Sequence, residues 1–167
     1  MIALALACKP KLLLADEPTT ALDATVQIQI LLLLRELQRE TGMSVIFVTH
    51  DIGAAVEVAD RIAVMYAGRI VEENAVADIL SAPRHPYTAG LLASTVSAAH
   101  RGQVLPTIAG APPDLAALPP GCAFAARCEA ATARCLAQQP ALQRHSSSAL
   151  ACWNPAGAVQ PLGPRAS

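Results

Sequence analysis

The composition of the chain changes near residue 100, and this change limits how each part can fold. Residues 1–100 contain several apolar runs, whereas leucine, isoleucine, valine and phenylalanine supply only 11 of the last 67 residues. That share, about 16%, lies under the roughly 20% below which a packed apolar core becomes doubtful. Nine of the 13 prolines also lie after residue 100. We therefore expect the first part to fold by burying apolar side chains, and the second part to need another source of stability.

Charge and aromatic content argue against two classes of function. The net charge of −1 provides no overall attraction to nucleic acid or to an anionic membrane surface. Aromatic residues make up only 3% of the chain, which is too few for a surface that stacks single-stranded bases. No uncharged apolar run reaches the roughly 18 residues that a membrane-spanning helix needs. We therefore expect no nucleic-acid partner and no transmembrane segment.

Strand and helix patterns alternate along the first 60 residues. Two continuous apolar runs, residues 11–15 and 44–49, are typical of parallel strands that are buried on both faces. Between them, apolar residues recur at helical spacing over residues 25–41, which predicts a helix with Gly42 as its left-handed end. Asp51 is expected to cap a further helix. This order of elements predicts an α/β fold with parallel strand pairs.

A hairpin and two shorter helices are expected next. Residues 61–66 and 69–72 read as strands on either side of a turn at Gly68. A short helix is expected over residues 76–81. Another should begin at Pro86, because proline suits the first position of a helix, and run to about residue 98.

Acidic and histidine side chains follow the two predicted strands. Asp16 and Glu17 end the first strand, and His50 follows the second. The carboxyl ends of parallel strands form the edge at which open α/β sheets bind ligands. A carboxylate there can hold Mg²⁺, and a neighbouring one can orient or deprotonate water. Taken singly, these residues also have ordinary explanations, since acids often end strands and Asp23 is well placed as a helix N-cap.

Together and in this order, the segments resemble the nucleotide-binding subunit of ABC transporters. Leu12–Glu17 looks like the Walker B strand with its catalytic glutamate, Thr20–Asp23 like the D-loop, and His50 like the switch histidine. Residues 66–71 are similar to the hairpin that follows in that family. The resemblance runs from residue 1 to about residue 94. It implies a partial P-loop NTPase-like sheet with flanking helices, followed by a loop-rich extension that contains cysteines.

The resemblance also implies a role for each matched residue. Asp16 would hold Mg²⁺ through water, and Glu17 would position and polarise the attacking water. His50 would contact the γ-phosphate of ATP. Asp23 would act across the interface with a second ATPase subunit. Phosphoryl transfer depends mainly on positioning and charge neutralisation, so these roles suit the side chains.

Three segments of the family are missing from the sequence: the phosphate-binding (Walker A) loop, the glutamine-bearing loop and the Gly-rich signature motif. A phosphate-binding loop needs Gly-x-x-x-x-Gly-Lys followed by Ser or Thr, and the only lysines are Lys9 and Lys11, neither of which has that context. The resemblance thus covers the C-terminal part of the family's subunit, and we expect a truncated subunit with no ATP binding or turnover of its own. Calorimetry on the purified 167-residue chain should detect no nucleotide binding, and a saturable signal would contradict this expectation.

Four of the five cysteines, Cys122, Cys128, Cys135 and Cys152, lie within 31 residues. They are separated by five, six and sixteen residues, and no Cys-x-x-Cys pair exists, which argues against an ordinary zinc finger. The chemistry of the residues leaves open disulfides, zinc and an iron–sulfur cluster. The fifth cysteine, Cys8, lies in an apolar run and is expected to be a small buried core residue.

The sequence after residue 83 resembles the C-terminal extension of dipeptide and oligopeptide importer ATPases. The matching segments are Arg84–Thr88, residues 119–124 and Arg127–Cys128. Some members of that subfamily carry a [4Fe–4S] cluster on four such cysteines, so the resemblance favours a cluster over zinc. It also implies uptake of di- or oligopeptides with transmembrane permease partners. The subunit would lie on the cytoplasmic face of the inner membrane as a peripheral protein.

These expectations divide the chain into three parts. Residues 1–82 would be the C-terminal half of an ABC ATPase core, residues 83–153 the extension with its four cysteines, and residues 154–167 a disordered tail. Two alternatives remain open from the sequence. The chain could be a small iron–sulfur or zinc-binding remnant, or a truncated reading frame without a function of its own.

Overall fold

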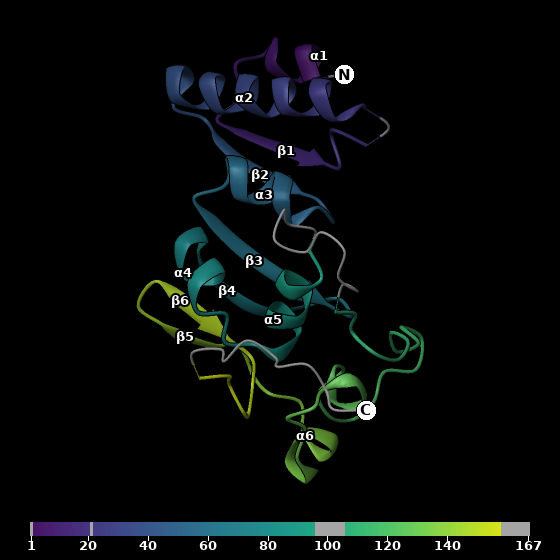
Figure 1. The fold of residues 1–167 in the computed structure, drawn as a ribbon. Helices are drawn as coiled ribbons and strands as arrows, with labels where there is room; N and C mark the ends of the chain where they lie inside the picture. The colour runs from purple at the N-terminus through teal and green to yellow at the C-terminus, as the bar shows by residue number, and fades with distance from the viewer. Residues whose placement is uncertain (1, 21, 96–105, 158–167) are drawn as a thin grey trace. The chain divides into compact units, whose positions relative to one another are not determined.

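The computed structural model describes residues 2–20, 22–95 and 106–157, and its contacts group into two compact units, Met1–Asp60 and Arg61–Ser167. Both units combine helices and strands, which confirms the mixed α/β class (Figure 1). The contacts divide the chain after Asp60, so the division at residues 82 and 153 stays a prediction. Most of the predicted tail, residues 158–167, lies outside the described residues. No helix in the described ranges is long and apolar enough to span a membrane.

The first unit is built on two parallel strands joined by a long helix. Strand β1 pairs with β2 in a register that runs from Leu12 opposite Ser44 to Asp16 opposite Val48, as the apolar runs predicted. Figure 1 shows the joining helix lying across β1. The elements of this unit are α1 (Ile2–Leu6), β1 (Leu12–Asp16), α2 (Ala24–Thr41), β2 (Ser44–Val48) and α3 (Ile52–Val58).

Local signals in the sequence set both ends of α2. At its start, Asp23 Oδ1 accepts hydrogen bonds from the backbone N–H groups of Thr25 and Val26, both at 3.0 Å. At its end, Gly42 has φ 68°, a left-handed conformation that glycine adopts without a steric penalty. The helix then packs against the sheet through a core of Leu13, Leu34 and Met43.

Two expectations about burial in this unit are wrong. The exposed fraction alternates along β1, so Leu13 is buried while Leu14 is 69% exposed. On β2, Ile46 is 52% exposed. Burial on both faces requires a layer of structure on each side of the sheet, and the alternation shows that only one face is covered here. Cys8 is exposed as well, because it lies in the turn after α1 rather than within the helix.

The second unit begins with the predicted hairpin. Strands β3 (Arg61–Tyr66) and β4 (Arg69–Ala75) pair in antiparallel fashion. Ala67 at φ 47° and Gly68 at φ 76° form the turn, and two positive φ angles in succession are typical of the hairpin turn whose twist matches its strands.

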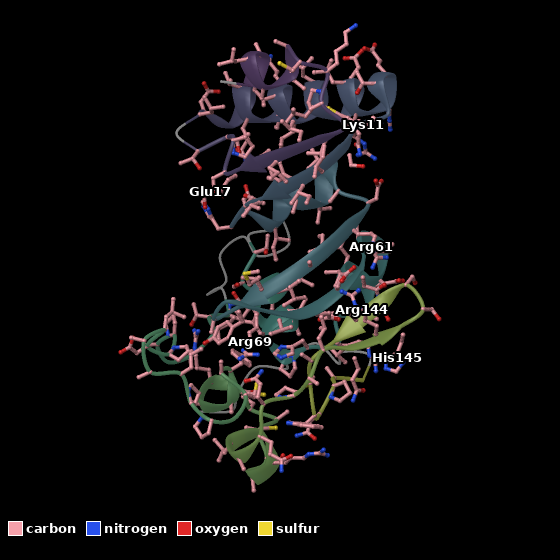
Figure 2. The ribbon with its side chains drawn as sticks, turned by 180° about the vertical axis from the view of Figure 1, so that it is seen from behind. Lys11, Glu17, Arg61, Arg69, Arg144 and His145 are labelled. Carbon is pink, nitrogen blue, oxygen red and sulfur yellow. The ribbon has the colours of Figure 1, made fainter. Side chains whose placement is uncertain are left out.

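The extension adds two strands that the sequence did not predict. Strand β6 (Ser148–Leu150) pairs with β4, and β5 (Gln143–His145) pairs with β6, so the sheet order is β3-β4-β6-β5. Figure 2 labels Arg61 and Arg144, whose guanidinium groups lie 2.9 and 3.4 Å from the two carboxylate oxygens of Glu73 on β4. Residues 143–150 are therefore part of the hairpin's sheet, rather than a separate loop region.

Short helices and one aromatic cluster complete this unit. Its core contains Val64, Tyr66, Val71 and Phe124, and the rings of Tyr66 and Phe124 meet edge to face with centroids 5.3 Å apart. The helices are α4 (Val76–Ser81), α5 (Pro86–Ala93), η2 (Ala125–Arg127, a single 3₁₀ turn) and α6 (Ala133–Ala137). The expected continuation of α5 to residue 98 falls partly on residues 96–105, which lie outside the described ranges.

Candidate functional site

Glu17 and His50 meet where the two parallel strands of the first unit end. His50 Nδ1 lies 3.0 Å from Glu17 Oε1. The register of the strands creates this contact. Asp16 pairs with Val48, so β1 and β2 end together at the same edge of the sheet. Figure 2 labels Glu17 at this edge. Two residues that are 33 positions apart in the sequence therefore form one polar group.

The backbone holds Glu17 in an uncommon conformation. Its φ is 43°, in the left-handed region that residues other than glycine seldom adopt. Its N–H donates to the carbonyl of Val48 at 2.9 Å, and the hydroxyl of Thr20 donates to its Oε2 at 2.8 Å. Strained backbone of this kind persists only where its surroundings fix it, and it is common at functional sites. Both carboxylate oxygens of Glu17 thus have a defined partner.

The contact changes the pKa of both partners in the direction expected for an ion pair. The hydrogen bond to His50 lowers the pKa of Glu17 from its ordinary value of 4.5, and the hydroxyl of Thr20 adds to this effect. The hydrogen bond to Glu17 raises the pKa of His50 above its ordinary value of 6.5. Both side chains are exposed, at 43% for Glu17 and 79% for His50, so water screens their attraction.

These directions define the pH range in which the pair stabilises the fold. The contribution of His50 is fully present below pH 6.5 and is lost as the pH rises through its raised pKa. The contribution of Glu17 is present above pH 4.5 and is lost as the pH falls through its lowered pKa. The ion pair is therefore complete between pH 4.5 and pH 6.5. It weakens when the pH falls through the lowered pKa of Glu17 or rises through the raised pKa of His50.

Replacing Glu17 with glutamine should lower the pKa of His50 toward 6.5, because the neutral amide no longer favours the imidazolium. An NMR titration of the His50 ring protons in the wild-type chain and in Glu17→Gln measures this shift. Glu40→Gln removes an exposed carboxylate at the other end of α2 and is the matched control, in which the His50 midpoint should stay at the wild-type value. Equal His50 midpoints in the wild type and in Glu17→Gln would show that the ion pair does not form in solution.

The other two predicted residues of this site are placed by β1 and by the start of α2. Asp16 is exposed at the last position of β1, next to Glu17. Asp23 caps α2, so its ordinary structural role is confirmed. The sequence did not indicate Gln27, whose amide donates to Asp51 Oδ2 at 3.3 Å. Asp51 also caps α3, so this contact ties the start of α2 to the loop that carries His50.

The four clustered cysteines line one pocket in the second unit. Cys122, Cys128, Cys135 and Cys152 reach it from four separate places in the chain, and Phe124 forms part of the same wall. All four are free thiols in this structure. Burial raises the pKa of Cys152 to about 11, and it also raises the pKa of Cys122 and Cys128. Without a bound cation the thiols of Cys122, Cys128 and Cys152 are therefore protonated at neutral pH.

Hydrogen-bond donors surround the sulfur atoms of this pocket. Backbone N–H groups of residues 124 and 125 donate to Cys122, that of residue 130 to Cys128, and that of residue 154 to Cys152. The side-chain amide of Asn154 lies 3.6 Å from the sulfur of Cys135. Such donors favour the thiolate over the thiol, so they offset part of the effect of burial on the pKa of these cysteines.

The thiols do not form a ready site for a single ion. Within the described ranges, no group of three or more His, Cys, Asp or Glu side chains is placed to hold one metal ion. The four cysteines line the pocket together with Phe124 and Pro140. The described residues therefore present a ready site neither for zinc nor for an iron–sulfur cluster. In an iron–sulfur cluster each thiolate binds a different iron, so the four sulfurs lie farther apart than around a single metal ion. Four thiolates are the usual ligands of such a cluster.

The structure adds His85 and Glu72 to the residues around this pocket. His85 is 1% exposed and lines the pocket. Glu72, 2% exposed, accepts hydrogen bonds from the backbone N–H groups of Arg84 and His85 at 2.7 and 2.9 Å. The sequence indicated His85-Pro86 both as part of the segment that resembles importer ATPases and as a helix start, and the helix start is confirmed, because His85 caps α5. Glu72 gave no signal, since an acid in a strand normally faces solvent.

Comparisons with known proteins point to the same proteins as the sequence motifs, the ATP-binding proteins of peptide transport. Residues 71–135 match the family model described as the oligopeptide/dipeptide transporter, C-terminal region. The chain is 51% identical over 154 residues to the dipeptide transport ATP-binding protein DppD of Bacillus subtilis, which covers 92% of this chain and 46% of that protein. It is 52% identical over 149 residues to the oligopeptide transport ATP-binding protein OppD of the same organism, covering 89% and 42%. The chain thus spans just under half the length of these relatives. By sequence the chain is similar to peptide-transport ATP-binding proteins over about nine-tenths of its own length, in the part that includes their C-terminal region.

Proposed function

We propose that this chain is the part of an ABC-type, peptide-importing ATPase subunit that acts on the γ-phosphate of ATP. The observation that carries the proposal is the contact between Glu17 and His50 at the carboxyl ends of two parallel strands. This edge is where open α/β sheets bind their ligands. The relatives that match the chain over about nine-tenths of its length are named as ATP-binding proteins of dipeptide and oligopeptide transport.

Each residue of the site has a distinct role in this proposal. Glu17 accepts a hydrogen bond from the attacking water and orients it toward phosphorus. His50, held by Glu17, donates to a γ-phosphate oxygen and stabilises the charge that develops there. Asp16 is an exposed carboxylate of the type that holds Mg²⁺ through water, and the ion would neutralise phosphate charge. Asp23 keeps the start of α2 in place and acts at the interface with a second ATPase subunit.

The proposal extends to fold, partners and location. The first unit, with β1, β2, α2 and α3, is part of the P-loop NTPase-like sheet of an ABC ATPase. The remainder of such a subunit supplies the phosphate-binding loop, which this sequence does not contain. Hydrolysis of ATP drives uptake of di- or oligopeptides through transmembrane permease subunits. The subunit is bound to them as a peripheral protein on the cytoplasmic face of the inner membrane.

We further propose that the four-cysteine pocket holds a [4Fe–4S] cluster, with Cys122, Cys128, Cys135 and Cys152 as its ligands. Two observations support it: all four thiols line one pocket, and hydrogen-bond donors surround their sulfurs. A bound cluster supplies a cross-link between four segments and a centre for one-electron transfer. The low content of apolar residues in this part of the chain makes such a cross-link useful for its stability.

A chimera tests the transport proposal. In it, this chain replaces the matched 154-residue segment of DppD, and the rest of DppD stays unchanged. In a Bacillus subtilis strain without DppD, the chimera should restore uptake of a radiolabelled dipeptide. A chimera that accumulates at the level of DppD and co-purifies with the membrane fraction, yet gives no uptake, would contradict the proposal.

A further inference from the structure

His85 has one ring nitrogen that the fold leaves without a partner. Its side chain lines the four-cysteine pocket and is 1% exposed. Its ring centroid lies 5.9 Å from that of Phe124, which covers part of the same pocket. Among the described residues, its Nε2 is buried and has no hydrogen-bond partner. Buried polar atoms are nearly always paired, so this atom calls for a specific explanation.

The other ring nitrogen fixes which atom carries the proton. The backbone N–H of Tyr87 donates to His85 Nδ1 at 3.0 Å. Because a backbone N–H is only a donor, Nδ1 must present its lone pair and cannot carry hydrogen. Burial lowers the pKa of His85 to about 4, so the ring is neutral at pH 7. The single ring proton is therefore on Nε2, which makes this atom a buried donor that lacks an acceptor.

The loop around His85 holds the ring firmly in this position. The carboxylate of Glu72 fixes the backbone N–H groups of Arg84 and His85. Pro86 then begins α5, and the side chain of His85 caps it. A ring that is tied at its backbone and at Nδ1 cannot rotate to find another partner for Nε2.

We propose that Nε2–H of His85 donates a hydrogen bond to a sulfur atom of the group that the four cysteines bind. Apart from the four thiols and Asn154, the pocket wall is mainly hydrocarbon and aromatic. The side-chain amide of Asn154 is engaged by Ala130, Thr132 and Cys135, so sulfur is the acceptor that the proposal assigns to His85. This inference rests on the proposed cluster. The hydrogen bond stabilises negative charge on sulfur. Because the reduced cluster carries more negative charge than the oxidised one, the hydrogen bond from His85 raises the reduction potential of the cluster.

Two substitutions separate this donor role from the helix-capping role. Asparagine at residue 85 places a side-chain oxygen near the position of Nδ1 and is a strong N-cap, but its amide does not reach the position of Nε2. Glutamine reaches the position of Nε2 with an N–H donor, but it caps helices poorly. His85→Asn therefore keeps the cap and loses the donor, whereas His85→Gln keeps the donor and loses the cap.

The experiment uses the full 167-residue chain, reconstituted anaerobically with iron and sulfide. Dye-mediated redox titration of the visible absorption should give a more negative potential for His85→Asn than for the wild type, and a potential near the wild type for His85→Gln. Urea unfolding should show the reverse order, with only His85→Gln clearly destabilised. Equal potentials in the wild type and His85→Asn would overturn the inference about His85 and leave the cluster standing.

A measurement on the chain without iron tests the tautomer separately. Long-range ¹H–¹⁵N correlation spectra of the imidazole should show a protonated Nε2 and an unprotonated Nδ1 for His85. A proton on Nδ1 would overturn the inference whether or not a cluster binds. A wild-type chain that takes up no iron and sulfide would overturn the cluster proposal and, with it, this inference.

Discussion

Replacing Gly121 with alanine is expected to unfold the cysteine segment. A Cβ at residue 121 would overlap the backbone carbonyls of Cys135 and Leu136, and backbone atoms cannot move aside as a flexible side chain can. The overlap would also break the hydrogen bond from Cys122 N–H to the Cys135 carbonyl, which is 2.7 Å long. Overpacking and the loss of a buried backbone hydrogen bond together should lower the free energy of unfolding by about 4 kcal/mol.

Urea unfolding followed by the fluorescence of Trp153 measures this effect. Trp153 is the single tryptophan, and it lines the four-cysteine pocket, so it reports on the segment directly. Gly157→Ala is the matched control, because a Cβ at residue 157 meets no other atom within 4 Å. The control should unfold at the wild-type midpoint. If Gly121→Ala also unfolds at the wild-type midpoint, residue 121 does not pack against the backbone of residues 135 and 136 as described here.

Replacing Glu17 with glutamine in the DppD chimera should lower the rate of ATP hydrolysis by at least about 100-fold, which is the lower end of what a positioned acid–base group contributes. ATP binding should persist, because glutamine has nearly the size of glutamate and its amide oxygen can replace one of the two carboxylate oxygens that contact His50 and Thr20. Glutamine is a far weaker base than the carboxylate, so the attacking water is no longer activated. The expected signature is a large loss in kcat with little change in the affinity for ATP.

Steady-state phosphate release and equilibrium binding of a fluorescent ATP analogue to the purified chimera separate these two quantities. Glu40→Gln in the same chimera is the control for removing one exposed carboxylate from the first unit. Its hydrolysis rate should equal that of the unmodified chimera. Hydrolysis by Glu17→Gln at the unmodified rate would remove Glu17 from the catalytic machinery.

The elements with strong local signals could be predicted from the sequence. Helix α2 was predicted to within one residue because Asp23, the helical spacing of its apolar residues and Gly42 all agree. The hairpin turn at Gly68 has an equally local cause, since two successive positive φ angles favour glycine. Parallel pairing of β1 with β2 followed from their continuous apolar runs.

Features that depend on distant partners could not be predicted. Strands β5 and β6 have three residues each, and β5 is wholly polar, so neither has a periodicity to detect. They form because β4 offers a free edge to β6, β6 in turn pairs with β5, and Glu73 pairs with Arg144. The exposure of Leu14 likewise depends on what covers the sheet, which its own sequence does not encode.

The two candidate sites also differ in how much of each could be predicted from the sequence. The motif order placed Asp16, Glu17 and His50 at one sheet edge, because strand ends in a parallel pair are fixed by the fold. The cysteines could be singled out, but the donors that surround them come from backbone geometry that appears only after folding. His85 looked like a simple helix start, and its unpartnered Nε2 is visible only once the pocket has formed.

The central claim is that Glu17 and His50 together face the phosphate that ATP loses. The most direct test is a crystal structure of the Glu17→Gln chimera with ATP and Mg²⁺. The account predicts the γ-phosphate within hydrogen-bonding distance of the His50 ring, with a water between phosphorus and the side chain of residue 17. A well-ordered nucleotide whose γ-phosphate lies away from both residues would contradict it.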